Sequence, residues 1–164
     1  MEIEGSCYCG QVRFRAVSHT PYPYMRCYCS ICRKTAGGGG YAINIMAMAD
    51  TLEVEGEGFV AAHHNRVDDD AHPGELVLSP GKGYCCRDCG SALWAADPRW
   101  EKWIYPFASA IDTPLPAPPE WVHIMLDFAA PWVVVPQGEG HRHFARYPDE
   151  SIEAWHNRHG LFQT

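Results

Sequence analysis

The feature that most constrains this chain is a run of three cysteines within six residues. Cys27, Cys29 and Cys32 lie in the sequence Cys-Tyr-Cys-Ser-Ile-Cys. In an extended segment, residues two apart point to the same side, so Cys27 and Cys29 face one point, and a turn after Ser30 brings Cys32 to it. Three converging thiolates without an evident fourth partner describe a zinc site with one open position. That open position is the candidate place for chemistry.

The chain as a whole has the composition of a folded, soluble protein. Its 164 residues are 46% hydrophobic and 12% aromatic, which predicts a single folded domain over residues 1–164, and the cysteine sets make it a zinc-binding domain. The net charge of −7 disfavours a nucleic-acid surface, which needs a basic face. The N-terminal residues do not have the pattern of a signal peptide, and no apolar stretch approaches the ~20 residues that span a bilayer, so we expect a cytoplasmic protein without a membrane partner. Disulfides are uncommon in that reducing compartment, so the eight cysteines point to metal.

A second set of cysteines has the spacing of a closed metal site. Cys7-x-Cys9 and Cys86-x-x-Cys89 supply two pairs of thiolates that are far apart in the sequence, as a tetrahedral structural zinc site needs. The alternative without metal is a group of buried or disulfide-bonded cysteines. Cys85 is expected to be a buried neighbour of this set, although it has an acceptable spacing to replace Cys86 as a ligand.

The chemistry of the three-cysteine set favours a sulfur-containing substrate. A shell of thiolates is soft and suits the capture of a further thiol, which would lose its proton on zinc. Arg33 and Lys34 are candidates to hold the carboxylates of such a substrate, and Gly37 begins a glycine run that lets a ligand approach the backbone. The alternatives are a solvated cation pair, a flexible turn, and a second closed structural site with Cys85 or a histidine as fourth ligand.

Alternating and apolar runs predict short strands separated by turns. Residues 63–74 are polar and predict a surface loop, and residues 113–119 form a proline-rich connection. We therefore expect a mostly β fold. The candidate strands cover residues 12–17, 24–26, 41–48, 52–55, 75–78, 92–94, 102–107 and 122–128, and a further apolar run covers 132–135.

One helix is expected near the C-terminus, over residues 149–159. Asp149 is the expected N-cap and Gly160 occupies the C′ position. Ile152, Trp155 and His159 share one face at helical spacing, so this helix is expected to dock on the sheet.

For the remaining tyrosine, histidine and tryptophan residues we expect structural roles or solvent exposure. Tyr28 is expected to pack in the core, although its hydroxyl is able to donate a proton. The histidines of polar segments are expected to face solvent, and the tryptophans are expected to pack in the core rather than line a pocket. These histidines are His63, His64, His72, His141 and His143, and these tryptophans are Trp94, Trp100, Trp103 and Trp132.

The three cysteine motifs, taken together and in this order, resemble those of the glutathione-dependent formaldehyde-activating enzyme family, which shares its domain with centromere protein V. The match is good from residue 5 to about 108 and loose at His123, Ile124 and Trp132. Two departures are Tyr28, where the family commonly has histidine, and Cys85, where an aromatic residue usually stands. The matching segments are Gly5-Ser6-Cys7-x-Cys9-Gly10-x-Val12-x-Phe14, Cys27-x-Cys29-Ser30-x-Cys32-Arg33-Lys34-x-x-Gly37 and Cys86-x-x-Cys89-Gly90-Ser91-x-Leu93.

The resemblance implies a β-tent fold of short antiparallel sheets around a structural zinc, with a C-terminal helix. It also implies two zinc ions per chain, one structural at the four-cysteine set and one catalytic at the three-cysteine set. The implied reaction is that of a carbon–sulfur lyase, which adds glutathione or a similar thiol to formaldehyde or another small carbonyl compound, or reverses that step. The alternative is a non-enzymatic zinc module that binds a protein partner.

Overall fold

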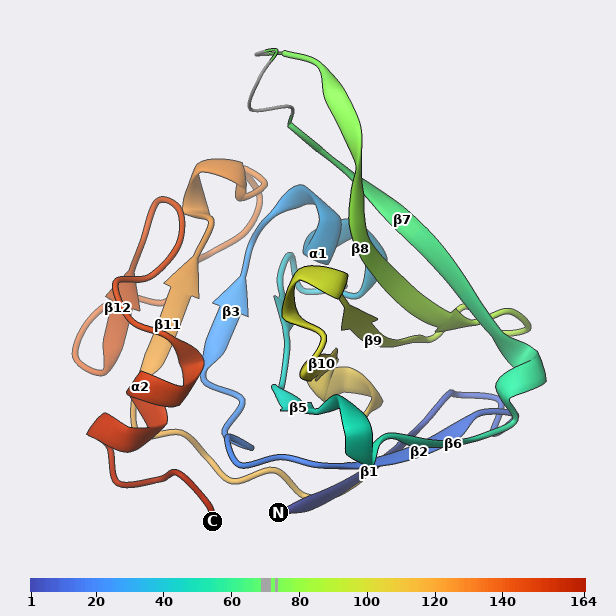
Figure 1. Ribbon diagram of the computed structural model, residues 1–164. Coiled ribbons are helices and arrows are strands. Elements are labelled where there is room, and N and C mark those ends of the chain that lie inside the picture. The colour runs from blue at the N-terminus through green and yellow to red at the C-terminus, as the bar shows by residue number, and fades with distance from the viewer. Residues whose placement is uncertain (69–71, 73) are drawn as a thin grey trace.

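Most of the chain folds into three β-sheets. We analysed a computed structural model, which describes residues 1–68, 72 and 74–164 (Figure 1). The first sheet is antiparallel and has the order β1 (Glu2–Ser6), β2 (Arg13–Val17) and β6 (Glu53–Glu55). Exposed and buried residues alternate along β1 and β2, which confirms the predicted strand at residues 12–17.

The second sheet has five antiparallel strands and includes a long hairpin. The strands β7 and β8 form the hairpin that projects from the body of the molecule in Figure 1. The predicted loop over residues 63–74 is wrong for residues 63–68, which lie in β7, while residues 69–71 and 73 lie outside the described residues. The strand forms despite its polar sequence because it pairs along its length with β8. The strand order is β5 (Ala47–Met48), β10 (Trp103–Pro106), β9 (Ala92–Ala96), β8 (Leu76–Cys86) and β7 (Val60–Asp68).

The third sheet is mixed. Its order is β12 (His141–His143), β11 (Trp121–Ile124), β3 (Met25–Cys27) and β4 (Ala42–Ile43). The strand β11 runs parallel to both β12 and β3, so the expectation of antiparallel sheets holds for the first two sheets and not for this one. Only β3 and β4 pair in the antiparallel sense here. The predicted strand 41–48 is divided between β4 in this sheet and β5 in the second sheet.

Buried apolar side chains join the sheets through three clusters. Phe14 of β2 packs edge-on against Trp94 of β9 with ring centroids 5.5 Å apart, and both are buried. A second cluster joins Ile3 of β1 to Ile104 of β10. The third lies between the mixed sheet and the C-terminal helix. The four tryptophans differ in burial. Trp94 lies in the core and Trp103 is half-buried, whereas Trp100 and Trp132 are exposed, so the expectation of core packing is wrong for the last two.

Two short α-helices accompany the sheets. The helix α1 (Ser30–Thr35) follows β3, and α2 (Ile152–Arg158) lies near the C-terminus. In the described part of the chain no helix is long and apolar enough to cross a membrane. Short 3-10 helices link other elements; they are Ala49–Thr51, Glu57–Phe59, Pro98–Trp100, Ala108–Ala110 and Leu126–Phe128.

The helix α2 begins later than the sequence predicts. Ser151 is its N-cap and accepts a hydrogen bond from the backbone N–H of Ala154, whereas Asp149 pairs with Arg142. The expected N-cap is therefore wrong, because Asp149 meets a better partner in the mixed sheet. Gly160 ends the helix with a φ of +67°, as expected for the C′ position.

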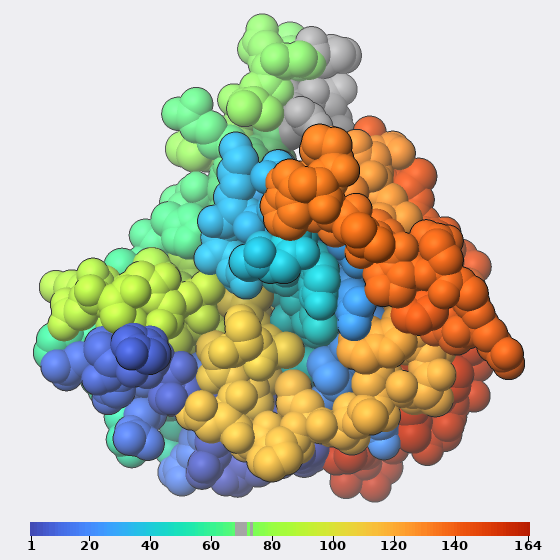
Figure 2. All heavy atoms as spheres, turned by 180° about the vertical axis from the view of Figure 1, so that it is seen from behind, coloured from blue at the N-terminus to red at the C-terminus, as the bar shows by residue number. Residues whose placement is uncertain are grey.

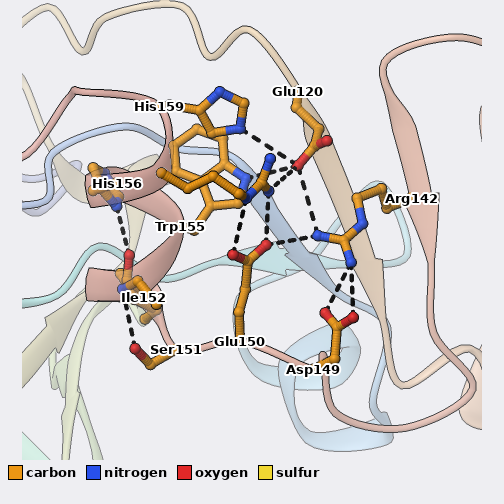
Figure 3. A network of polar contacts seen from close by, with 11 residues as sticks. Glu120, Arg142, Asp149, Glu150, Ser151, Ile152, Trp155, His156 and His159 are labelled. Carbon is orange, nitrogen blue, oxygen red and sulfur yellow. Dashed lines mark hydrogen bonds and ion pairs between the residues drawn. The ribbon is translucent and has the colours of Figure 1, made fainter.

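Trp155 docks α2 on the mixed sheet, as predicted. Its ring is fully buried and stacks on Tyr24 with centroids 3.8 Å apart, and its indole N–H donates to Glu120 at 2.9 Å. A network of charged groups surrounds this contact (Figure 3). Arg158 donates to both Glu120 and Glu150, and its hydrogen bond holds the pKa of Glu150 below its ordinary value.

The segment between β11 and β12 lies against the glycine run that follows α1. A Cβ added to Gly40 would collide with Val133, and Gly40 has a φ of +91°, so only glycine fits this close approach. From behind the molecule, this segment appears in orange above and beside the cyan residues of the glycine run (Figure 2).

Candidate metal centres and active site

Four cysteines converge between the first and second sheets. Two come from the turn after β1, one ends β8 and one lies in the turn that follows β8, and their sulfur atoms all lie within 4.8 Å of one another. The Sγ of Cys9 lies 3.5 Å from that of Cys7 and 3.7 Å from that of Cys86. Zinc–sulfur bonds of ~2.3 Å at tetrahedral angles place sulfur atoms about 3.8 Å apart. The predicted set Cys7, Cys9, Cys86 and Cys89 therefore has the separation that one zinc ion requires.

Hydrogen-bond donors point at the sulfur atoms of this cluster. The backbone N–H of Val12 donates to Cys7 Sγ at 3.2 Å, and Ser91 Oγ lies 3.2 Å from Cys89 Sγ. The hydroxyl and backbone N–H of Ser91 lower the pKa of Cys89 to about 6. Such donors favour thiolates, which are the form that binds metal.

Cys85 does not belong to the cluster. It is half-buried on β8 opposite Ala61, while the adjacent Cys86 is fully buried and contributes its sulfur to the group. The alternative in which Cys85 replaces Cys86 as a ligand is therefore not the arrangement of this structure.

The three-cysteine set also converges, at the junction of β3 and α1. Cys27 ends β3, Cys29 is the N-cap of α1, and Cys32 lies within the helix. Their sulfur atoms all lie within 4.8 Å of one another, and no other His, Cys, Asp or Glu among the described residues joins them at that separation. The turn that brings Cys32 to the others is a helical turn, in which Cys29 Sγ accepts a hydrogen bond from the Cys32 N–H at 3.3 Å.

The three thiols cannot all ionise without a nearby cation. Hydrogen bonds from Cys27 and Cys32 lower the pKa of Cys29 to about 3. The resulting thiolate raises the pKa of Cys27 to about 12, and hydrogen bonds to Cys27 and Cys29, together with burial, raise the pKa of Cys32. A metal cation at this point reverses that repulsion and favours three thiolates, so the donor set fits a soft divalent ion such as zinc.

The predicted substrate-binding residues line a cleft beside α1. Arg33, Lys34 and Gly37 border a cavity of about 710 Å³ together with Tyr8 and Ser91. The three thiols are not among its lining residues. Lys34 is exposed, whereas Nε of Arg33 is buried without a hydrogen-bond partner among the described residues.

Gly37 has a structural role of its own. It is buried, and a Cβ at this position would collide with the backbone carbonyl of Tyr41. The absence of a side chain is therefore explained by packing within the chain, without a ligand.

Tyr28 lies between Cys27, which ends β3, and Cys29, the N-cap of α1, and its side chain reaches the histidines of the mixed sheet. Its buried hydroxyl lies 2.9 Å from Nδ1 of His123, and Nε2 of His123 lies 3.0 Å from Nδ1 of His141. Burial and the nearby charges of His143, Arg26 and His141 lower the pKa of His123 to about 4. A neutral His123 has one donor and one acceptor nitrogen, so it uses one of them with Tyr28 and the other with His141.

These contacts test the expectations for the tyrosine and the histidines. Tyr28 is packed, as expected, but it belongs to a polar chain that the sequence did not reveal. The solvent-facing expectation is confirmed for His63, His64, His72 and His143, and it is wrong for His141, which is half-buried. The one available signal for His123 was a polar residue inside the apolar run 122–128.

Comparisons with known proteins identify the family of this chain. The family model of the glutathione-dependent formaldehyde-activating enzyme matches residues 2–126. A Halomonas elongata protein that carries the name of the same family is 55% identical over 161 residues, which cover 98% of this chain and 98% of the relative. A Rhodobacter sphaeroides protein of known crystal structure is similar with a TM-score of 0.46 and 20% identity, over 69% of this chain and 91% of that one. The chain belongs to the glutathione-dependent formaldehyde-activating enzyme family.

Proposed function

We propose that this protein is a zinc-dependent carbon–sulfur lyase of the S-(hydroxymethyl)glutathione synthase type. The observation that carries the proposal is a cluster of three cysteine sulfurs that no fourth ligand among the described residues completes. The chain also has a second, separate cluster, whose four sulfur atoms are enough to fill a tetrahedral shell. Membership of the family supports glutathione as the thiol and formaldehyde as the carbonyl compound.

The two clusters have different roles in this proposal. The four-cysteine cluster would hold a structural zinc, because its four thiolates fill a tetrahedral shell. Cys27, Cys29 and Cys32 would hold the second zinc and leave one position for the substrate. Zinc bound there would lower the pKa of an incoming thiol, so that it reacts as a thiolate.

The chain's own residues bind and orient the thiol substrate. Arg33 and Lys34 supply positive charge at the cleft beside α1, where they would pair with the carboxylates of glutathione. The short helix places these two cations directly after Cys32 in the chain, so the substrate's charged groups and its sulfur are held by one element. Holding both reactants in place supplies several kcal/mol by proximity.

The reaction is an addition that needs no oxidant. The sulfur of the thiol forms a bond to the carbonyl carbon, the carbonyl π bond breaks, and the oxygen takes up the proton that the thiol has lost. In the reverse direction the carbon–sulfur bond breaks, and the carbonyl compound is released with the free thiol.

The test compares Cys32→Ser with the unmodified protein. We expect the variant to stay folded with one zinc per chain and to lose acceleration of S-(hydroxymethyl)glutathione formation above the uncatalysed rate, measured by NMR exchange. Retained acceleration would overturn the proposal. Two zinc ions in the unmodified protein with no acceleration would favour a non-enzymatic zinc module instead.

A second variant tests the cations. The double substitution of Arg33 and Lys34 by glutamine should raise KM for glutathione about tenfold with kcat unchanged, because it removes binding that is equal in the ground and transition states. An unchanged KM would show that the two residues are only a solvated pair.

A further inference from the structure

One face of the mixed sheet gathers an arginine, three histidines and several aromatic side chains. In paired strands, residues in register point to the same side, and residues two apart along one strand do too. Arg26 is in register with His123, which is in register with His143. The opposite face carries Val122 and Ile124 and packs against Trp155 of α2. The face that points away from α2 is called the cationic face here; it comprises Arg26, Tyr28, Tyr41, Trp121, His123, His141 and His143.

Arg26 is held rigidly on this face. Its guanidinium carbon lies 4.1 Å from the centroid of the Trp121 ring and 4.8 Å from that of the Tyr41 ring. Stacking on two rings fixes the plane of the guanidinium. Burial raises the pKa of Tyr28, and the charge of Arg26 and its hydrogen bond to Tyr28 oppose that rise, so part of the guanidinium edge already has a partner within the face. The side chain is half-buried, so part of it remains accessible.

No anionic partner accompanies Arg26 among the described residues. Its Nε is buried without a hydrogen-bond partner, and no described carboxylate forms an ion pair with it. Five other arginines, Arg15, Arg99, Arg142, Arg146 and Arg158, each pair with a carboxylate, whereas Arg33 shares with Arg26 a buried Nε that has no partner among the described residues. Partly burying a cation without a counter-charge is costly, and Arg26 is the one of these two that lies between two aromatic rings, so it points to a ligand.

The surroundings of Arg26 provide the rest of a binding site. His141 is half-buried at the end of the hydrogen-bond chain from Tyr28, and its ring is able to donate or accept. From behind, the surface is hollowed beside the orange segment, and the blue and teal atoms at its floor belong to the segments that contain β3 and β4 (Figure 2).

We propose that the cationic face binds a small ligand through a carboxylate group, which pairs with the guanidinium of Arg26. The planar fork of arginine matches the two oxygens of a carboxylate, and the two aromatic rings exclude water from one side of the pair. This site lies across β3 from the three thiols and does not depend on the proposed lyase reaction.

The test measures binding to the metal-loaded protein by isothermal titration calorimetry. The probes are succinate, S-methylglutathione, which keeps the carboxylates but has no free thiol, and 2-mercaptoethanol, which has a thiol and no carboxylate. We expect Arg26→Gln to weaken binding of the carboxylate probes roughly 10- to 100-fold, as the loss of hydrogen bonds to a charged group does. Binding of 2-mercaptoethanol should not change.

Arg146→Gln is the matched control. Arg146 also stacks on an aromatic ring, at 4.3 Å from Phe128, but it already pairs with Asp127 at 3.0 Å. Its substitution should leave the affinity for every probe unchanged. If Arg26→Gln does not fold, Arg26→Lys keeps the charge and removes the planar fork, and a loss of affinity of about tenfold is then expected.

The outcomes separate the sources of the carboxylate. Arg26-dependent binding of succinate supports a site for free carboxylates, and Arg26-dependent binding of S-methylglutathione alone supports a site for part of a larger thiol substrate. Failure of every carboxylate probe to bind the unmodified protein would overturn the proposal. Equal affinities for the unmodified protein and the Arg26 variants would overturn it as well, and Arg26 would then be a structural cation between two rings.

Discussion

Tyr28 lies between two members of the three-cysteine cluster, but its hydroxyl contacts a histidine of the mixed sheet. Its hydroxyl is the start of a buried chain through His123 to His141. We expect Tyr28→Phe to lower the free energy of unfolding by roughly 1–3 kcal/mol, because it leaves Nδ1 of His123 buried and unpaired. Urea denaturation measures this loss, and metal content should not change. Tyr41→Phe is the control, since Tyr41 is only half-buried and its ring contacts remain.

The protonation of His123 is a second residue-scale prediction. Its pKa of about 4 lies below the ordinary value of histidine, so the folded protein takes up this proton only in acid. The unfolded chain binds the proton below about pH 6.5, so the stability contributed by neutral His123 is present above that pH and is lost as the pH falls towards 4. An NMR titration of the imidazole should show a neutral ring at pH 5.5. A ring that titrates near pH 6.5 would contradict the buried chain.

Spacing along the chain predicted the three-cysteine cluster because its geometry is local: Cys27 ends a strand, and Cys29 and Cys32 follow on one helical turn. In the four-cysteine cluster the spacing predicted each pair, and the fold brings the two pairs together. Arg26 has no such local signal. Its ring partners Tyr41 and Trp121 come from neighbouring strands, so the site exists only after the mixed sheet has formed.

At the scale of elements, α2 holds the outer face of the mixed sheet through one side chain. We expect Trp155→Ala to destabilise the protein by about 3–5 kcal/mol, because it leaves a cavity beside Tyr24 and removes the hydrogen bond to Glu120. Thermal denaturation measures the effect. Trp100→Ala serves as control and should change stability little, since Trp100 is 54% exposed. Similar losses in the two variants would contradict this account of helix docking.

Two features of the sheets were not predicted from the sequence, and each has a physical reason. The strand β7 has a polar sequence over residues 63–66 and is stabilised by backbone pairing with β8, which leaves no hydrophobic periodicity to detect. The parallel pairing of β11 with β3 joins segments almost one hundred residues apart, and no local pattern specifies that register. Strands with clear alternation, such as β2, were predicted correctly.

At the scale of the whole molecule, the four-cysteine cluster ties the first sheet to the second. We expect Cys86→Ser to lower the melting temperature by at least about 10 °C, because the free energy of metal binding contributes to folding. Cys85→Ser is a close control, since Cys85 is the adjacent residue and lies outside the cluster. It should keep the metal content and the melting temperature. A stable, metal-loaded Cys86→Ser protein would contradict the structural role.

The central claim is that Cys27, Cys29 and Cys32 hold a metal ion with one position open to a thiol. The most direct measurement is the absorption spectrum of the cobalt-substituted protein before and after addition of glutathione. The account predicts that glutathione raises the thiolate-to-cobalt charge-transfer absorbance by the contribution of a single further thiolate, and that Cys32→Ser abolishes the change. An identical spectrum with and without glutathione in the fully loaded, unmodified protein would contradict it.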